Sequence, residues 1–189
     1  MLLIIDNGSC YLNSLKETLD TWKIKFKVYN NDQRYPLRNA KGIILSGGPG
    51  NPATRTDLKN NYLALEQAKA PILGICLGHE IIAYHYGARI ERLPKQQTGL
   101  QEIVLSQNYE LFKGLGKRFF LEKMHHYHVA TLPTNFKALG SSKNCPFEII
   151  KHRTKPIYGL QGHPEVSKDG TIIIKNFLKL CGIRNKFIY

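Results

Sequence analysis

A cysteine between two glycines is the residue of this chain whose surroundings point most directly to chemistry. The segment 74–79 reads Gly-Ile-Cys-Leu-Gly-His, with an apolar run before Cys76 and a helical pattern directly after it. This is the pattern of a nucleophile elbow, in which the flanking glycines leave room for a tight turn. A helix N-terminus beneath the sulfur favours the thiolate, and the N–H of Leu77 is expected to point toward an oxyanion. The alternative is that Cys76 is a small buried hydrophobic residue.

A histidine and a glutamate near the end of the chain supply the other groups that a cysteine nucleophile needs, a base and a residue that orients it. His163 and Glu165 follow an apolar run and lie two residues apart. In an extended segment they face the same way, so Glu165 is expected to hold one imidazole nitrogen while the other faces Cys76. Alone, the His-Pro-Glu tripeptide is also typical of a surface turn. The catalytic interpretation depends on its pairing with the elbow.

A glycine-rich segment after another apolar run is the third candidate. Residues 46–52 read Ser-Gly-Gly-Pro-Gly-Asn-Pro, so the segment offers backbone N–H groups rather than side chains. Such groups suit an oxyanion or a carboxylate. The segment lacks the Gly-Lys-Ser/Thr ending of a phosphate-binding P-loop, and the chain has no Gly-x-Gly-x-x-Gly, so no nucleotide site is predicted. A plain turn between a strand and a helix is the alternative.

The elements that must position these residues follow an alternating pattern. Short apolar runs predict strands at 2–5, 25–29, 42–45, 71–75, 89–91, 102–105, 119–121, 147–151 and 157–161. Amphipathic stretches predict helices at 12–22, 57–69, 77–86 and 171–180. This order predicts a single α/β domain over 1–189, with three layers, a mostly parallel central sheet, helices on both faces and a small antiparallel patch. The glycine-rich segment and the elbow then fall at the carboxyl ends of parallel strands, where ligands bind.

The bulk composition excludes several other classes. In 189 residues with 42% hydrophobic and 22% charged side chains, no apolar run is long enough to span a bilayer. The opening residues 1–8 predict a buried strand rather than a signal peptide, so a cytoplasmic location is expected. Four widely spaced cysteines indicate neither a zinc site nor a disulfide framework. Adjacent histidines within 125–128 would face opposite sides of a strand, which disfavours a metal site.

The net charge of +13 favours acidic partners, although a lysine-rich solvated surface explains it as well. No basic run is dense enough to indicate a nucleic-acid-binding arm.

The three motifs together resemble, in order and spacing over essentially the whole chain, the class I (triad) glutamine amidotransferases, which have a flavodoxin-like fold. The resemblance implies that Cys76 attacks the side-chain amide of glutamine and that His163 and Glu165 complete the triad. It implies no metal or organic cofactor on this chain.

The same resemblance assigns the residues that surround the substrate. Gly48 and Leu77 fall on the backbone donors of the oxyanion hole, Gly50 lies close to bound glutamine, and Glu80 occupies a substrate-contacting position.

Within the family, residues 5–9, 151–159 and 175–182 resemble the separate glutaminase subunit of archaeal-type GMP synthetase. That branch implies a partner, an ATP-dependent synthetase subunit, which would hold ATP and magnesium and aminate XMP. Two alternatives stay open. One is a glutaminase subunit of anthranilate or aminodeoxychorismate synthase, which usually opens with an Asp-Asn-Tyr-Asp-Ser-Phe-like stretch that this chain lacks. The other is a catalytically weakened relative that binds or regulates.

The chain departs from the family pattern around the substrate. Glu80 stands where the family usually has Gln, and an ionised Glu would lose the amide donor and add negative charge near the sulfur. Gly162 stands where Phe is usual, which predicts a less packed and freer loop. The segment 124–128 replaces a Ser-His-x-Asp segment, so its usual Ser and Asp are missing. Residues 97–100 lack a Tyr that usually follows the sixth strand.

Overall fold

The computed structural model describes residues 1–184 and 186, and its centre is one sheet of nine strands in the order β2-β1-β3-β4-β9-β8-β7-β5-β6. Five strands pair in parallel: β1 (Leu2–Asp6), β2 (Phe26–Asn30), β3 (Gly42–Leu45), β4 (Ile72–Ile75) and β9 (Ile157–Leu160). β1, β3, β4 and β9 consist almost wholly of buried apolar residues, as strands covered on both faces require. The mostly parallel sheet predicted from the alternating pattern is therefore confirmed.

The antiparallel part continues the same sheet. It contains β8 (Ile149–His152), β7 (Phe136–Ser141), β5 (Ile90–Leu105) and β6 (Arg118–Val129). The two short strands predicted at 89–91 and 102–105 are the ends of the one long β5, whose pairing with β6 shifts register between Arg92 and Gln97. β7 was not predicted, because its sequence Phe-Lys-Ala-Leu-Gly-Ser carries little β-branched character.

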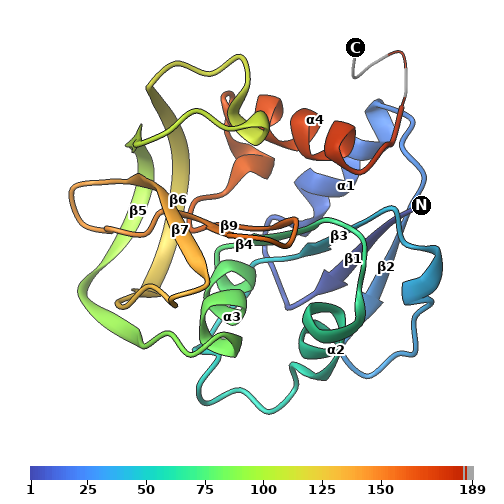
Figure 1. The fold of residues 1–189 in the computed structure, drawn as a ribbon, viewed down its shortest axis with the longest axis horizontal. Helices are drawn as coiled ribbons and strands as arrows, with labels where there is room; N and C mark the ends of the chain where they lie inside the picture. The colour runs from blue at the N-terminus through green and yellow to red at the C-terminus, as the bar shows by residue number, and fades with distance from the viewer. Residues whose placement is uncertain (185, 187–189) are drawn as a thin grey trace.

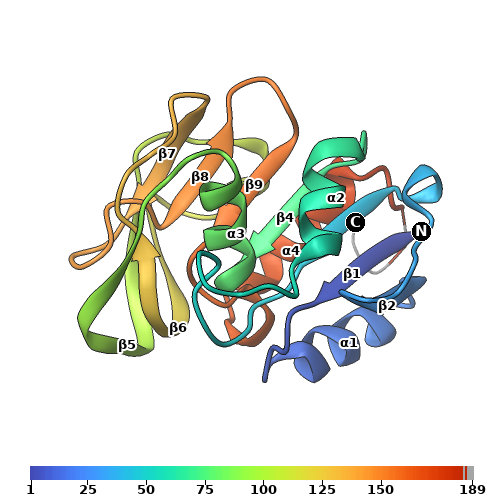
Figure 2. The same cartoon turned by 90° about the horizontal axis from the view of Figure 1, so that it is seen from below.

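Helices cover both faces of the parallel strands (Figures 1 and 2). α1 (Leu12–Thr21) and α4 (Gly170–Leu180) lie on one face, and α2 (Lys59–Gln67) and α3 (Leu77–His85) on the other. The period of two in β1 explains the two layers, since Leu2 and Ile4 pack with α1 and α4 while Leu3 and Ile5 pack with α2 and α3. The layered arrangement is the one predicted.

Short 3₁₀ helices complete the fold: η1 (Leu37–Asn39), η2 (Glu110–Phe112) and η3 (Pro164–Val166). None of the helices in the described residues is both long and apolar enough to cross a membrane.

Candidate active site

Cys76 occupies the sharp turn between β4 and α3. Its φ of 49° is unusual for a residue with a side chain, and its N–H donates to the carbonyl of Leu160 on the neighbouring β9 at 2.7 Å. The flanking glycines are required because other backbone segments come too close for a side chain. A Cβ at Gly74 would lie 2.5 Å from the backbone of Gly78, and one at Gly78 would lie 2.2 Å from the carbonyl oxygen of Leu45. The predicted elbow is therefore present.

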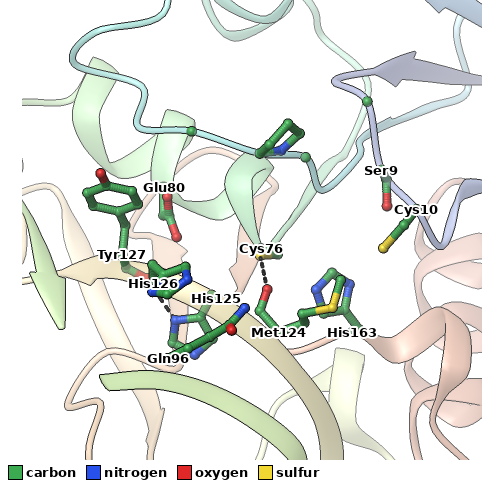
Figure 3. Close-up of a pocket in the computed structure, with 14 residues that line it drawn as sticks. Ser9, Cys10, Cys76, Glu80, Gln96, Met124, His125, His126, Tyr127 and His163 are labelled. Atoms are coloured by element: carbon green, nitrogen blue, oxygen red, sulfur yellow. Dashed lines mark hydrogen bonds between the residues drawn. The ribbon is translucent and has the colours of Figure 1, made fainter. Parts of the chain in front are cut away.

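His163 follows β9 and faces the same cavity as Cys76 (Figure 3). Its Nδ1 lies 3.0 Å from Oε1 of Glu165, and because a carboxylate only accepts, Nδ1 is the donor. The other ring nitrogen, Nε2, is buried and has no hydrogen-bond partner among the residues that the structure describes. His163 is thus oriented as predicted, with a lone pair on Nε2. The segment is not extended throughout, because Glu165 lies in η3.

Contacts from two distant segments fix the position of His163. The backbone N–H of His163 donates to the carbonyl of Glu122 on β6 at 2.9 Å. The ring of Tyr11 packs edge-on against the imidazole, with centroids 4.7 Å apart. The Tyr11 hydroxyl in turn contacts the sulfur of Met124 at 3.8 Å.

The glycine-rich loop after β3 approaches Cys76 and His163 so closely that side chains would not fit. A Cβ at Gly47 would lie 3.1 Å from Cε1 of His163, and one at Gly48 would lie 2.1 Å from the carbonyl oxygen of Asn7. Arg55 holds the loop from outside, since its Nη1 donates to the carbonyls of Asn7 and Pro49 at 2.9 and 3.2 Å. The loop therefore presents backbone to the cavity, as predicted.

These residues surround one cavity of about 350 Å³ (Figure 3). Of the predicted site residues, Cys76, His163, Gly48, Gly50 and Glu80 line it. Glu165 lies behind His163, and Leu77 is not among the residues that line the cavity, although its N–H lowers the pKa of Cys76.

Other cavity residues were missed by sequence reasoning. Gly8, Ser9 and Cys10 come from the loop after β1, and Gln96 from the register shift in β5. Residues 8–10 follow a predicted strand and Gln96 lies between two predicted strands, but no pattern marks any of them as a site residue. The segment 124–127 of β6, noted from the sequence only as a departure, forms another wall.

Comparison with known proteins assigns this arrangement to one family. The sequence profile of glutamine amidotransferase class-I matches residues 3–180. The chain belongs to the class-I glutamine amidotransferase family. It is 39% identical to a glutamine-hydrolysing GMP synthase subunit of Pyrococcus abyssi, over 96% of this chain and 99% of that protein. The corresponding subunit of Methanococcus aeolicus is 40% identical over 97% and 98% of the two chains.

Solved structures agree with this assignment. A crystal structure from Thermoplasma acidophilum, described as a GMP synthase subunit, matches with a TM-score of 0.89 and 29% identity over 96% of this chain and 93% of that one. A glutamine amidotransferase from Thermotoga maritima shares the fold, with a TM-score of 0.76 at 19% identity over 94% and 80%.

The protonation of the amidotransferase thiol differs from the sequence-based expectation. Burial raises the pKa of Cys76 well above its ordinary value, and the charges of Glu80 and Glu165 raise it further. The N–H of Leu77 and the ammonium of Lys123 lower the pKa, but burial dominates. The contacts fit a thiol, because Sγ lies 4.0 Å from the carbonyl of Met124 (Figure 3). A base is therefore needed to form the thiolate.

Glu80 faces the cavity but is not the ionised group expected from the sequence. Its side chain is 2% exposed, and burial raises its pKa to about 8, although a hydrogen bond from Gln161 opposes this. Nε2 of Gln161 donates to Oε1 of Glu80 at 2.9 Å. At neutral pH the carboxyl is mostly protonated, so it can donate a hydrogen bond as the amide of Gln would.

Gly162 does not loosen its loop as predicted. The residue is buried, and a Cβ there would lie 2.8 Å from Cβ of Leu121 and 3.3 Å from Nζ of Lys123. The glycine is a point of close approach between β6 and the segment that leads to His163. The expectation of a freer loop is wrong, because side chains of β6 fill the space.

The histidines of β6 behave as alternating strand residues. His125 is buried and His126 is exposed, so adjacent histidines face opposite sides as expected. Nδ1 of His125 lies 2.8 Å from the carbonyl of Tyr127, and burial lowers the pKa of His125 to about 4. Within the described part of the chain, no group of three or more His, Cys, Asp or Glu side chains is placed to hold a metal ion.

Proposed function

We propose that this chain is the glutaminase subunit of a two-subunit, cytoplasmic GMP synthase. It hydrolyses glutamine to glutamate and ammonia and supplies the ammonia to an ATP-dependent synthetase subunit, which aminates XMP. The observation that carries the proposal is the unpartnered Nε2 of His163 in the cavity of Cys76, with Nδ1 bound to Glu165. Full-length similarity to glutamine-hydrolysing GMP synthase subunits supports the choice of acceptor.

In the first half-reaction, Nε2 of His163 takes the Cys76 proton and the thiolate attacks the amide carbon of glutamine. The Glu165 carboxylate stabilises the resulting imidazolium through Nδ1–H. The backbone N–H groups of Gly48 and Leu77 donate to the oxyanion. The C–N bond then breaks, and the imidazolium gives its proton to the departing nitrogen, which leaves as ammonia.

In the second half-reaction, His163 removes a proton from water, and the hydroxide attacks the γ-glutamyl thioester. The C–S bond breaks, the sulfur regains a proton from the imidazolium, and glutamate leaves. Every proton is taken or returned by one imidazole, so this chain needs no metal or organic cofactor. ATP and magnesium are required on the partner, where the acceptor is activated.

The lining of the cavity suits glutamine. Cys76 and His163 are 4% and 3% exposed, so both are largely shielded from solvent. The neutral Glu80 carboxyl and the glycine-rich loop both line the cavity, and both offer donors to an amide or a carboxylate. The intact His163–Glu165 contact favours an active enzyme over the catalytically weakened alternative. The names of the similar proteins favour GMP synthesis over anthranilate or aminodeoxychorismate synthesis.

The test is Cys76→Ala in the complex reconstituted with the synthetase subunit from the same genome. GMP formation from glutamine should fall to background, while formation from ammonium chloride should stay within about twofold, because the acceptor site lies on the other chain. Cys181→Ala is the matched control, since Cys181 is a buried free cysteine at the end of α4. Glutamine-driven synthesis by Cys76→Ala would refute the nucleophile, and failure with both nitrogen sources would refute the acceptor.

A further inference from the structure

A buried ion pair lies beside the active site and has no part in the steps described above. The ammonium of Lys123 contacts the carboxylate of Glu148, and the two side chains are 0% and 1% exposed. The other carboxylate oxygen of Glu148 accepts from the hydroxyl of Ser142 at 2.6 Å. Burying two charges is costly, and an apolar pair of the same size is often as stable, so stability alone is a weak explanation for this pair.

Both members are joined through the backbone to residues of the site. Lys123 lies between Glu122, whose carbonyl accepts from the N–H of His163, and Met124, whose carbonyl contacts the Cys76 sulfur. The carbonyl of Glu148 accepts from the N–H of Gln161 at 2.8 Å. The ion pair therefore connects β6 to the segment that carries His163.

The packing around Gly162 brings the ammonium close to the segment that carries His163. A Cβ at this position would lie 3.3 Å from Nζ of Lys123, after a closer approach of 2.8 Å to Cβ of Leu121. The charge also reaches other groups of the site. Burial, and after it the charge of Lys123, lowers the pKa of His79 to about 3, so this fully buried histidine stays neutral and adds no second positive charge.

We propose that Lys123 is a positioning residue for the chemistry of Cys76: its buried ammonium, held by Glu148 and accommodated by Gly162, supplies the fixed positive charge that supports the reacting sulfur. The inference rests on the proposed role of Cys76 as nucleophile.

The charges around the sulfur explain why a fixed positive charge is needed there. Glu165 on η3 disfavours the thiolate, and so does Glu80 on α3 once it ionises near its pKa of about 8. Lys123 on β6 opposes them together with the N–H of Leu77. The other titratable residues that line or adjoin the cavity are Cys10, Tyr11, His125, His126, Tyr127 and His163. A charge that is already in place needs no reorganisation when the thiolate and the oxyanion form. The carboxylate of Glu148 compensates this charge in the buried position.

The test compares a variant that removes the charge with one that keeps it. Lys123→Met/Glu148→Gln removes both charges at nearly constant volume, so the apparent pKa for alkylation of Cys76 should rise by about one unit or more. Glutamine turnover should fall about tenfold, mainly in kcat. Lys123→Arg keeps a positive charge that burial does not neutralise, so its alkylation pKa should stay within about half a unit of the wild-type value. Loosened packing alone would not separate the two variants in this way.

Iodoacetamide rates between pH 6 and 10, with the labelled cysteine identified by peptide mass, give these values. The control is Arg118→Met/Glu102→Gln, which removes an exposed ion pair between β6 and β5 and should leave the pH profile unchanged. Unchanged alkylation in a folded double variant would overturn the proposal. If the double variant loses its cooperative thermal transition, Glu148→Gln is measured instead: without its carboxylate the buried ammonium loses its proton, so the alkylation pKa should rise, and an unchanged or lowered pKa overturns the proposal. A wild-type protein whose Cys76 does not titrate at all would instead refute the nucleophile.

Discussion

Gln161 donates from Nε2 to Oε1 of Glu80 at 2.9 Å, and the same nitrogen lies 4.0 Å from the sulfur of Cys76. A buried amide thus fixes the orientation of a buried carboxyl at the wall of the cavity. Because the bond occupies Oε1, the proton of the neutral carboxyl is carried by Oε2. Below the pH at which Glu80 ionises, the carboxyl gives the cavity a hydrogen-bond donor. Above that pH, it gives the cavity an extra negative charge.

Glu80→Gln should stabilise the fold increasingly as the pH rises from about 5 to 8. The pKa of Glu80 is raised to about 8, so in this range the folded protein retains a proton that the unfolded chain releases, and wild-type stability falls as the pH rises. Gln has no such proton, and the gain should exceed about 1 kcal/mol at pH 8.5. Urea unfolding at pH 5.5, 7 and 8.5 measures it. A gain that is independent of pH would contradict a protonated Glu80.

The same substitution should change the enzyme little below pH 7 and substantially above pH 8. Neutral Glu80 donates as Gln does, whereas ionised Glu80 repels the thiolate and the substrate carboxylate. At pH 9 the variant should therefore alkylate faster at Cys76 and show a KM for glutamine several-fold lower than wild type. Steady-state kinetics and iodoacetamide rates between pH 6 and 9 provide the comparison. Identical profiles across this range would show that Glu80 does not act on the cavity.

His163→Ala should reduce glutaminase kcat by about 10³-fold or more, nearly as much as loss of Cys76, because triad members act as a unit. Glu165→Gln should cost less, about 10²-fold or more, since the imidazole keeps its neighbour but loses the charge that stabilises imidazolium. Glutamate release by the purified complex is the measurement, and His85→Ala at the far end of α3 is the control. A near-normal rate in His163→Ala would mean that another group acts as base.

Gly48→Ala should damage the oxyanion loop, because the new Cβ would lie 2.1 Å from the carbonyl oxygen of Asn7. Moving the loop displaces a proposed oxyanion donor, so kcat/KM should fall about 10²-fold or more. The fold should lose roughly 1–3 kcal/mol from overpacking. Gly116→Ala is the matched control, since Gly116 is exposed and its Cβ would meet nothing closer than 3.5 Å. Equal kinetics of the two variants would exclude a role for the loop.

Association with the synthetase subunit should weaken as salt rises. The net charge of +13 steers an acidic partner surface toward the chain, and salt screens this attraction beyond about 8 Å at physiological ionic strength. The dissociation constant should increase at least roughly tenfold between 50 and 500 mM NaCl, mostly through slower association. Surface plasmon resonance over a salt series measures both rates. A constant association rate would leave the charge with a role in solubility only.

Local patterns were sufficient to predict the parts of the site that depend on neighbouring residues. The elbow at Cys76, the His163–Glu165 pair and the glycine-rich loop each lie within a few residues, and each requires a particular backbone. Strands such as Gly42–Leu45 were predicted with their observed bounds because a buried parallel strand is a short run of apolar residues.

The features that were missed depend on distant parts of the chain. Lys123 and Glu148 are separated by 25 positions and meet only after the antiparallel strands have paired. The neutral state of Glu80 follows from burial, which the sequence does not specify. Gly162 was expected to give a freer loop, because the side chains of β6 that pack against it could not be identified from the sequence.

The positive φ of Cys76 places a conflict between reactivity and stability at a single position. A residue with a Cβ pays roughly 1–2 kcal/mol for such a backbone conformation, and glycine does not. By backbone conformation alone, glycine would therefore be favoured at position 76, and glycine cannot react. The cysteine is explained by its chemistry and not by the backbone that it occupies. In a lineage that no longer depended on the reaction, position 76 would be expected to change to glycine while the rest of the fold persisted. A glycine at position 76 in an otherwise intact domain would then indicate that the activity had been lost.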